Sequence, residues 1–118
     1  MVVDDDPLVL ALFERFIRDI PGVEVRTAKS GIHALNLLER ESCDVLITDQ
    51  SMPGISGEDL LLTVARRWPK TRRILITGYW TPQLSGDADA HITLEKPITG
   101  ARLRLHVETE IRRAEKGG

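Results

Sequence analysis

Two short runs of mostly aliphatic residues, VLIT at 45–48 and ILIT at 74–77, place the strongest limit on the fold of this chain. Neither run alternates with polar residues, and unbroken runs of this kind are typical of strands that are buried on both faces. Strands of that type occur in parallel sheets whose two faces are covered by helices. The two runs therefore predict an α/β fold with a parallel sheet at its centre.

Longer amphipathic segments alternate with runs of this type along the whole chain. The strand candidates are the segments 2–3, 23–28, 43–49, 72–78 and 92–97. Helical spacing of apolar residues predicts helices at 8–20, at 31–41, at 58–68 and from residue 100 onward. The alternation contains no repeat and no linker, so it predicts one domain over residues 1–118.

Each predicted helix should bury one apolar stripe against the sheet. The expected stripe of the first helix is Leu8, Leu12, Phe16 and Ile20, widened by Phe13 and Ile17. The expected stripes of the second and last helices are Ile32, Leu35, Leu37 and Leu38, and then Leu103, Val107 and Ile111 with Leu105 beside them. Pro7, Ser30, Ser56 or Gly57, and Thr99 are the expected helix starts.

Composition excludes several classes of function. The net charge of −2 gives no strong attraction to nucleic acid or to an anionic membrane. The densest basic cluster is interpreted as a solvated surface, and it consists of Arg66, Arg67, Lys70, Arg72 and Arg73. The single cysteine, Cys43, is expected to be a small core residue. No apolar stretch reaches membrane-spanning length, and a cytoplasmic location is predicted.

Polar side chains follow four of the predicted strands directly. They are Asp4, Asp5 and Asp6 after the first strand, then Asp49, Thr77 and Lys96 at the ends of three later strands. Because parallel strands end at one edge of a sheet, these groups should meet there, where open α/β folds place their sites. Carboxylates for a divalent cation, a hydroxyl and an ammonium together suit the binding of a phosphoryl group.

Four sequence blocks carry a family resemblance. The segments VVDDDPLVL, DVLITDQSMPGISG, RILITGY and LEKPI resemble, in order and spacing, the signature blocks of the receiver domain of bacterial two-component response regulators. The resemblance covers nearly the whole chain. It implies a flavodoxin-like, doubly wound, five-stranded parallel sheet of order 2-1-3-4-5 with helices on both faces.

The resemblance also assigns roles to the polar residues. Asp49 is implied to be the phosphoryl acceptor, and Mg²⁺, or another divalent cation such as Mn²⁺ or Ca²⁺, is implied to be the cofactor. The implied metal ligands are Asp5 directly, Asp4 mainly through water, Asp49 itself and the main-chain carbonyl of Ser51. Without metal, the close carboxylates should raise one another's pKa.

Two further residues have implied roles at the phosphoryl group. Thr77 would donate a hydrogen bond to a phosphoryl oxygen, and Lys96 would place its ammonium on another oxygen. Gly78 leaves room beside Thr77, and a cis peptide bond is expected between Lys96 and Pro97.

Simpler interpretations of these polar residues remain open. Asp4 to Asp6 also suit the start of a helix, where acidic residues meet the positive end of the helix dipole. Asp87, Asp89 and His91 alternate like metal ligands but lack the calcium-loop pattern, so a polar loop is favoured.

The sequence departs from the family pattern at three places. The first strand, Val2–Val3, is short: either the chain start has been clipped or Met1 supplies the remaining burial. Thr93 stands where the family usually has an aromatic switch residue, and Tyr79 or Trp80 is the alternative reporter. The stretch between Thr77 and Lys96 is shorter than usual, which predicts a fourth helix that is truncated, displaced or mobile.

The predicted function is that of a phosphoacceptor signalling domain in a histidine–aspartate relay, not of a dedicated enzyme. The implied partners are a sensor histidine kinase or phosphotransfer protein, and then an effector protein or a second receiver, with no nucleic acid or membrane contact. The chain is either a stand-alone receiver or part of a larger regulator or hybrid kinase. One alternative is a receiver-like interaction module that signals without phosphorylation. A haloacid dehalogenase-like phosphohydrolase is disfavoured, because Ser51 stands where a second aspartate is needed.

Overall fold

The computed structural model describes residues 1–79, 81, 83 and 89–117. The strands are β1 (Val2–Val3), β2 (Thr27–Ala28), β3 (Val45–Asp49), β4 (Arg72–Thr77) and β5 (Ile92–Glu95). The helices are α1 (Pro7–Ile17), α2 (Gly31–Arg40), α3 (Gly57–Arg67) and α5 (Gly100–Gly117). The predicted irregular fourth helix concerns residues 81 to 90, most of which lie outside the described part of the chain.

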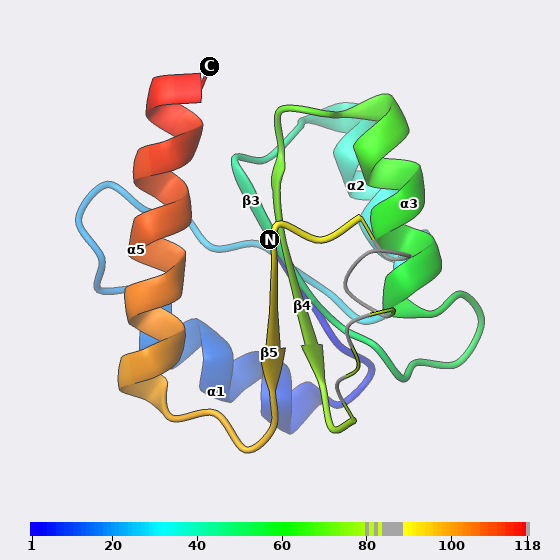
Figure 1. Ribbon diagram of the computed structural model, residues 1–118, viewed down its shortest axis with the longest axis horizontal. Helices are drawn as coiled ribbons and strands as arrows, with labels where there is room; N and C mark the ends of the chain where they lie inside the picture. The colour runs from blue at the N-terminus through cyan, green and yellow to red at the C-terminus, as the bar shows by residue number, and fades with distance from the viewer. Residues whose placement is uncertain (80, 82, 84–88, 118) are drawn as a thin grey trace.

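The strands form one parallel sheet of order β2-β1-β3-β4-β5, which confirms the predicted topology. Helices α1 and α5 cover one face of the sheet and α2 and α3 cover the other (Figure 1). The carboxyl ends of β4 and β5 point to the same edge, at the bottom of that view. The fold thus brings the residues that follow the strands to one edge.

The central strands β3 and β4 contribute side chains to two separate core clusters, because alternate side chains along a strand point to opposite faces of the sheet. Leu46 and Leu75 lie in the cluster under α2 and α3, whereas Ile47, Ile74 and Ile76 lie in the cluster under α1 and α5. All five side chains are at most 2% exposed. The unbroken apolar runs are therefore explained by burial on both faces, as predicted.

The predicted stripe of α1 is wrong by part of a turn. Phe13 and Ile17 are buried, but Leu8 is 79% exposed and Leu12 is 45% exposed. The helix ends at Ile17, so Ile20 reaches the core from the turn that follows and not from a continuing helical stripe. The buried stripe is therefore centred on Phe13 and Ile17 and not on Leu8 and Leu12.

Two other helix faces also differ from the prediction. Ile32 in α2 is 56% exposed and Leu105 in α5 is 60% exposed. Gly31 faces the core instead of Ile32, and it lies so close to Ile55 that an added Cβ would stand 2.2 Å from that side chain. Ile55 lies in the loop between β3 and α3. Its close packing against the start of α2 fixes which face of that helix is buried.

Hydrogen-bonded caps fix the starts of the helices where the sequence predicts them. Asp6 accepts a hydrogen bond from the Leu8 N–H, and Ser30 and Ser56 accept from His33 and Asp59. The Thr99 hydroxyl accepts from the Arg102 N–H in the same way. Each cap satisfies an N–H group that a helix start would otherwise leave unpaired.

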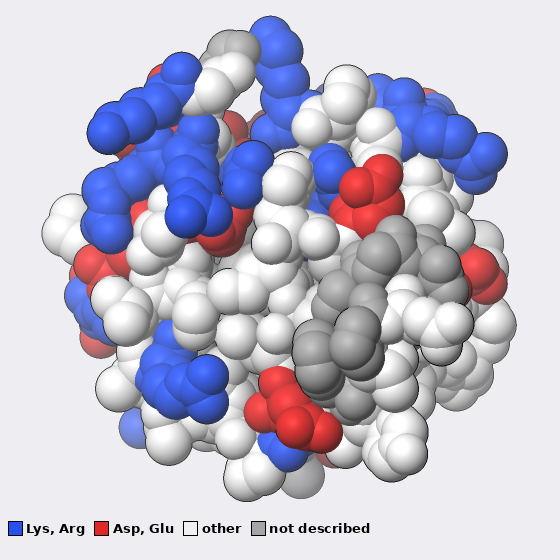
Figure 2. Space-filling view, viewed as in Figure 1, with Lys and Arg blue, Asp and Glu red and all other residues white. Residues whose placement is uncertain are grey.

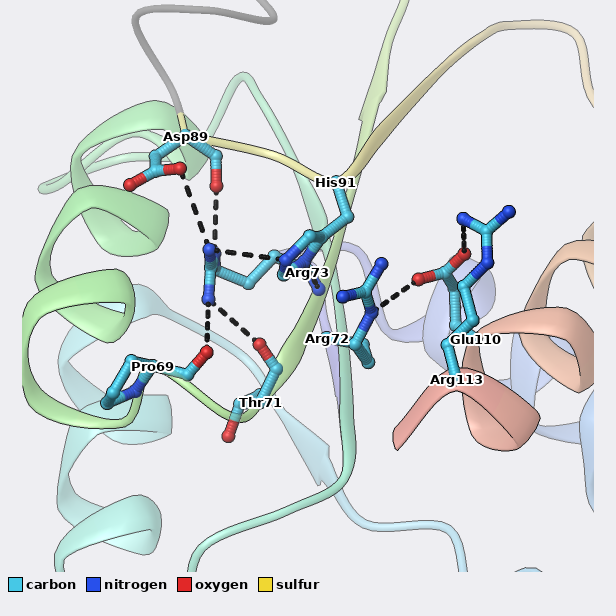
Figure 3. A network of polar contacts seen from close by, with 8 residues as sticks. All are labelled: Pro69, Thr71, Arg72, Arg73, Asp89, His91, Glu110 and Arg113. Atoms are coloured by element: carbon cyan, nitrogen blue, oxygen red, sulfur yellow. Dashed lines mark hydrogen bonds and ion pairs between the residues drawn. The ribbon is translucent and has the colours of Figure 1, made fainter. Parts of the chain in front are cut away.

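The prediction that Arg72 and Arg73 belong to a solvated surface is wrong. Arg73 is 6% exposed, and its guanidinium donates to the main-chain carbonyls of Pro69, Thr71 and Asp89 (Figure 3). Arg72 pairs with Glu110 of α5 on the other side of the strand. The two arginines thus tie the amino end of β4 to structure on both faces of the sheet.

The same network disfavours the charged form of His91. The main-chain N–H of Arg73 donates to His91 Nδ1 over 3.0 Å, which requires that this nitrogen carry no proton. Partial burial and the charges of Arg73 and Arg72 lower the pKa of His91 below its usual 6.5, although Glu110 and Asp89 act in the opposite direction.

Acidification is expected to destabilise the fold through His91. Because the folded-state pKa lies below the unfolded one, the unfolded chain binds the proton more readily, and stability falls as the pH drops through about 6.5. His91→Asn keeps an acceptor for the Arg73 N–H but does not titrate. The free energy of unfolding, measured with urea, should fall less between about pH 7 and about pH 5 for this variant than for wild type. Equal losses would contradict the role given to His91.

Candidate functional site

Three carboxylates meet at the carboxyl edge of the sheet. Val3 of β1 pairs with Thr48 of β3, so the next residues along the two strands, Asp4 and Asp49, lie side by side. Asp5 adds a third carboxylate, and one ligand oxygen from each residue lies within 4.8 Å of the others. Asp4 and Asp49 are buried, whereas Asp5 is exposed. The short first strand thus suffices to build the predicted acidic cluster.

The environment of Asp4 disfavours its charge. Burial raises its pKa, and the charges of Asp49 and Asp5 raise it further, while a hydrogen bond from the Asp6 N–H and the charge of Lys96 oppose the shift. For Asp4, the prediction that the close carboxylates raise one another's pKa is confirmed, with burial as the larger cause. A divalent cation bound by the three carboxylates would remove the repulsion, and carboxylate oxygens are the ligands that Mg²⁺ and Ca²⁺ prefer.

Asp6 does not join the cluster. Its side chain caps α1 through the Leu8 N–H at 2.9 Å. The helix-cap interpretation of the acidic run therefore holds for Asp6, and the metal-cluster interpretation holds for Asp4 and Asp5.

Lys96 lies against Asp49. Its Nζ is 2.8 Å from Asp49 Oδ1, and its main-chain N–H donates to the Thr77 carbonyl at 2.8 Å. The Lys96–Pro97 peptide bond is cis, as predicted. The Asp49 carboxylate thus contacts the ammonium of Lys96 and also belongs to the acidic cluster.

Thr77 is the last residue of β4 and only 4% of it is exposed. Its hydroxyl is occupied by the following turn, since Oγ1 accepts from the Tyr79 N–H at 3.1 Å and can donate to the Tyr79 carbonyl at 3.2 Å. Tyr79 itself is 80% exposed. A new acceptor near Thr77 would therefore compete with the Tyr79 carbonyl for the hydroxyl proton.

Two residues beside Asp49 had no role in the predicted site. Gly57 lies against the Asp49 main chain, where an added Cβ would stand 2.2 Å from the carbonyl oxygen. Gln50 accepts a hydrogen bond from the Glu58 N–H on its side-chain oxygen at 2.8 Å. Ser51, the predicted carbonyl ligand, is exposed in the loop that follows. The dipeptide Ser56–Gly57 is a sequence signal for a helix start but not for contact with Asp49.

The other polar candidates lie elsewhere. His91 and Asp89 contact Arg73 at the amino end of β4, far along the strand from Thr77, and Asp87 lies outside the described residues. In the described part of the chain, the cluster of Asp4, Asp5 and Asp49 is the single group of acidic, His or Cys side chains close enough together to hold a metal ion.

Charge is distributed unevenly over the face seen in Figure 2. Most Lys and Arg side chains lie in the upper half, over the C-terminal part of α5 and the amino ends of the strands. A small acidic patch lies in the lower half, near the ends of β4 and β5, with Lys or Arg atoms next to it. Among the described residues, no helix has the length and apolar character needed to cross a membrane.

Comparison with known proteins agrees with this geometry. The model of the response regulator receiver domain family matches residues 1–108. The response regulator PilR of Pseudomonas aeruginosa is 34% identical over 115 residues, which cover 95% of this chain and 26% of PilR. The hydrogenase transcriptional regulatory protein HoxA of Cupriavidus necator is 39% identical over 84 residues, covering 67% of this chain and 16% of HoxA. The chain therefore spans about a quarter or less of these two relatives.

Solved structures give the same result. The CheY-like receiver domain protein of Methanospirillum hungatei superposes with a TM-score of 0.90 at 26% identity, covering 99% of this chain and 95% of the other. A receiver domain protein of Clostridium thermocellum gives 0.87 at 30% identity, with 99% and 96% covered. The chain belongs to the response regulator receiver domain family.

Proposed function

We propose that Asp49 is the phosphoryl acceptor of this receiver domain. A phosphoacceptor role is typical of the family. The observation that carries the assignment is that the Asp49 carboxylate lies in a cluster with Asp4 and Asp5 and is also 2.8 Å from the ammonium of Lys96. Asp49 is the member of the cluster that contacts both kinds of charge.

The reaction is a transfer between two side chains. A carboxylate oxygen of Asp49 forms a bond to phosphorus while the P–N bond of a partner's phosphohistidine breaks, and the electron pair of that bond returns to the imidazole. A small acyl phosphate can serve as donor in the same way, with its carboxylate as leaving group. Hydrolysis of the new acyl phosphate resets the domain.

The approach of an anionic phosphoryl donor to three carboxylates requires added positive charge. Asp4, Asp5, Asp49 and the Ser51 carbonyl are the groups that would hold a divalent cation, with Mg²⁺ as the proposed ion. When bound, such a cation neutralises charge on the attacking and the transferred oxygens.

Lys96 and Thr77 are proposed to bind the transferred group. Lys96 can leave Asp49 for a phosphoryl oxygen, because its ammonium is a compact charge on a flexible stem. The Thr77 hydroxyl can exchange the Tyr79 carbonyl for another oxygen. That exchange would release the turn at residues 78–79 and shift an existing conformational equilibrium.

Membership of the family supports a proposal for the biological setting of the chain. The phosphoryl donor is a sensor histidine kinase or a phosphotransfer protein of a bacterial cytoplasm. The phosphorylated domain then changes its contacts with an effector region, an effector protein or a second receiver. The domain serves as a phosphoacceptor and not as a dedicated enzyme.

Phosphorylation by acetyl phosphate tests the proposal. With Mg²⁺, the intact mass of wild type should increase by one phosphoryl group, and the increase should disappear with a chelator or with Asp49→Asn. That substitution keeps the size of the side chain and removes its nucleophilic charge. An unmodified wild type that also fails to bind beryllofluoride would favour a module that signals without phosphorylation. Sustained turnover of unrelated phosphate esters would favour a hydrolase.

A further inference from the structure

Gln50, the residue after Asp49, is anchored through its main chain to two different elements. Its N–H donates to the carbonyl of Ile76 in β4 at 2.9 Å. Its carbonyl accepts from the N–H of Gly57, the first residue of α3, at 2.9 Å. The start of the loop that leaves Asp49 is therefore joined to its end.

The side chain of Gln50 adds a second link to the same helix. Oε1 accepts from the Glu58 N–H at 2.8 Å, and Nε2 lies 3.5 Å from Glu58 Oε2. A helix start leaves its first N–H groups without partners inside the helix. Here Gln50 satisfies two successive ones, those of Gly57 and Glu58, while Ser56 satisfies the N–H of Asp59 at 3.1 Å.

These bonds close the loop 51–56 into a ring whose two ends meet at Gln50. Ser51 is the first residue of that ring, and Asp49 directly precedes Gln50. A loop with fixed ends has fewer conformations to lose when one of its groups must adopt a single orientation. The Ser51 carbonyl, proposed above as a cation ligand, is such a group.

We propose that Gln50 is a positioning residue for the cation site, acting through the hydrogen bond that its side-chain oxygen accepts from the Glu58 N–H. This proposal rests on the proposed function of the Asp49 site. In this role Gln50 would touch neither the cation nor the phosphoryl group. It sets the direction in which the chain leaves Asp49 and so orients the Ser51 carbonyl.

Two substitutions separate positioning from simple capping of α3. Gln50→Met keeps the length of the side chain and removes its acceptor. Ser56→Ala removes the neighbouring cap of the same helix, at the far end of the loop, and leaves Gln50 in place. If capping alone mattered, both variants would behave alike in Mg²⁺ binding.

The first measurements are Mg²⁺ affinity by calorimetry and amide hydrogen exchange by NMR. Loss of a residue that orients a metal ligand lowers affinity by about tenfold or more. We expect that loss for Gln50→Met, with faster exchange of the Glu58 amide, and less than about a twofold change for Ser56→Ala. Equal Mg²⁺ affinities in the two variants would overturn the proposal.

A measurement on wild type keeps the proposal testable if Gln50→Met does not fold. Coupling between two sites is reciprocal, so if the Gln50–Glu58 bond favours Mg²⁺ binding, Mg²⁺ must strengthen that bond. Saturating Mg²⁺ should slow exchange of the Glu58 amide more than that of the Asp59 amide. Bound Mg²⁺ without this difference would overturn the role of Gln50. Failure of wild type to bind Mg²⁺ or to become phosphorylated would instead overturn the proposed function.

Discussion

Replacement of Gly57 by alanine is expected to destabilise the fold and to prevent phosphorylation of Asp49. An added Cβ would stand 2.2 Å from the Asp49 carbonyl oxygen and 2.9 Å from its carbonyl carbon. Both atoms belong to the main chain, so no side-chain rotation can relieve the overlap. Either the end of β3 or the start of α3 must move, which also breaks the hydrogen bond from the Gly57 N–H to Gln50.

Urea unfolding should show a loss of about 3 kcal/mol for Gly57→Ala, at the upper end of the range for overpacking. Gly78→Ala is the matched stability control, because an added Cβ there meets nothing within 4 Å. Its free energy of unfolding should change by no more than about 0.5 kcal/mol. Wild-type stability and phosphorylation in Gly57→Ala would show that the contact with Asp49 is not required.

Loss of Arg72 is expected to destabilise the fold, because the buried carboxylate of Glu110 would lose its main positive partner. Glu110 is 1% exposed, and it accepts from Arg72 Nε at 2.8 Å and from Arg113 Nη1 at 3.3 Å (Figure 3). The side chain of Arg113 is 59% exposed, so it compensates the buried charge poorly. Arg72→Met should cost about 3 kcal/mol, the lower end of the range for breaking a buried pair.

A double-mutant cycle separates this pairing from lost packing. Arg72→Met combined with Glu110→Met removes both charges and should recover most of the lost stability, because apolar residues can replace a buried ion pair. The partly exposed pair Arg104–Glu108 supplies the control, and Arg104→Met should cost at most about 0.5 kcal/mol. A double variant less stable than Arg72→Met alone would contradict the explanation.

The central strands β3 and β4 and the main site residues could be predicted because each depends on local sequence, whereas of the predicted strand 23–28 only Thr27–Ala28 is a strand. VLIT and ILIT mark strands buried on both faces, and Asp49, Thr77 and Lys96 stand directly at strand ends. Parallel topology then brings those ends to one edge without further information. The order of the strands came from the resemblance to a family and not from the runs themselves.

The buried faces of the helices could not be predicted with the same success. Apolar residues occupy more than one face of α1, α2 and α5, so periodicity alone does not distinguish Leu12 from Phe13 or Ile32 from Gly31. The choice depends on neighbours distant in sequence. Ile55 packs against Gly31, and Phe16 packs against Gly100.

Polar contacts between distant residues had no signal in the sequence. Glu110 lies 38 residues from Arg72, and its burial depends on that partner. Gln50 caps a helix that begins at Gly57, although a capping side chain is normally sought next to the helix start. Only the folded arrangement of β3 and α3 brings the Gln50 side chain to the Glu58 N–H.

The position of the phosphoryl group is the most direct test of the assignment of Asp49. An acyl phosphate reacts with borohydride, which reduces the modified aspartate to homoserine and leaves free carboxylates unchanged. After phosphorylation with acetyl phosphate and Mg²⁺, peptide mass spectrometry should find homoserine in place of Asp49 and at no other acidic position. Reduction at Asp4 or Asp5, or phosphorylation without any reducible residue, would contradict the proposal that Asp49 accepts the phosphoryl group.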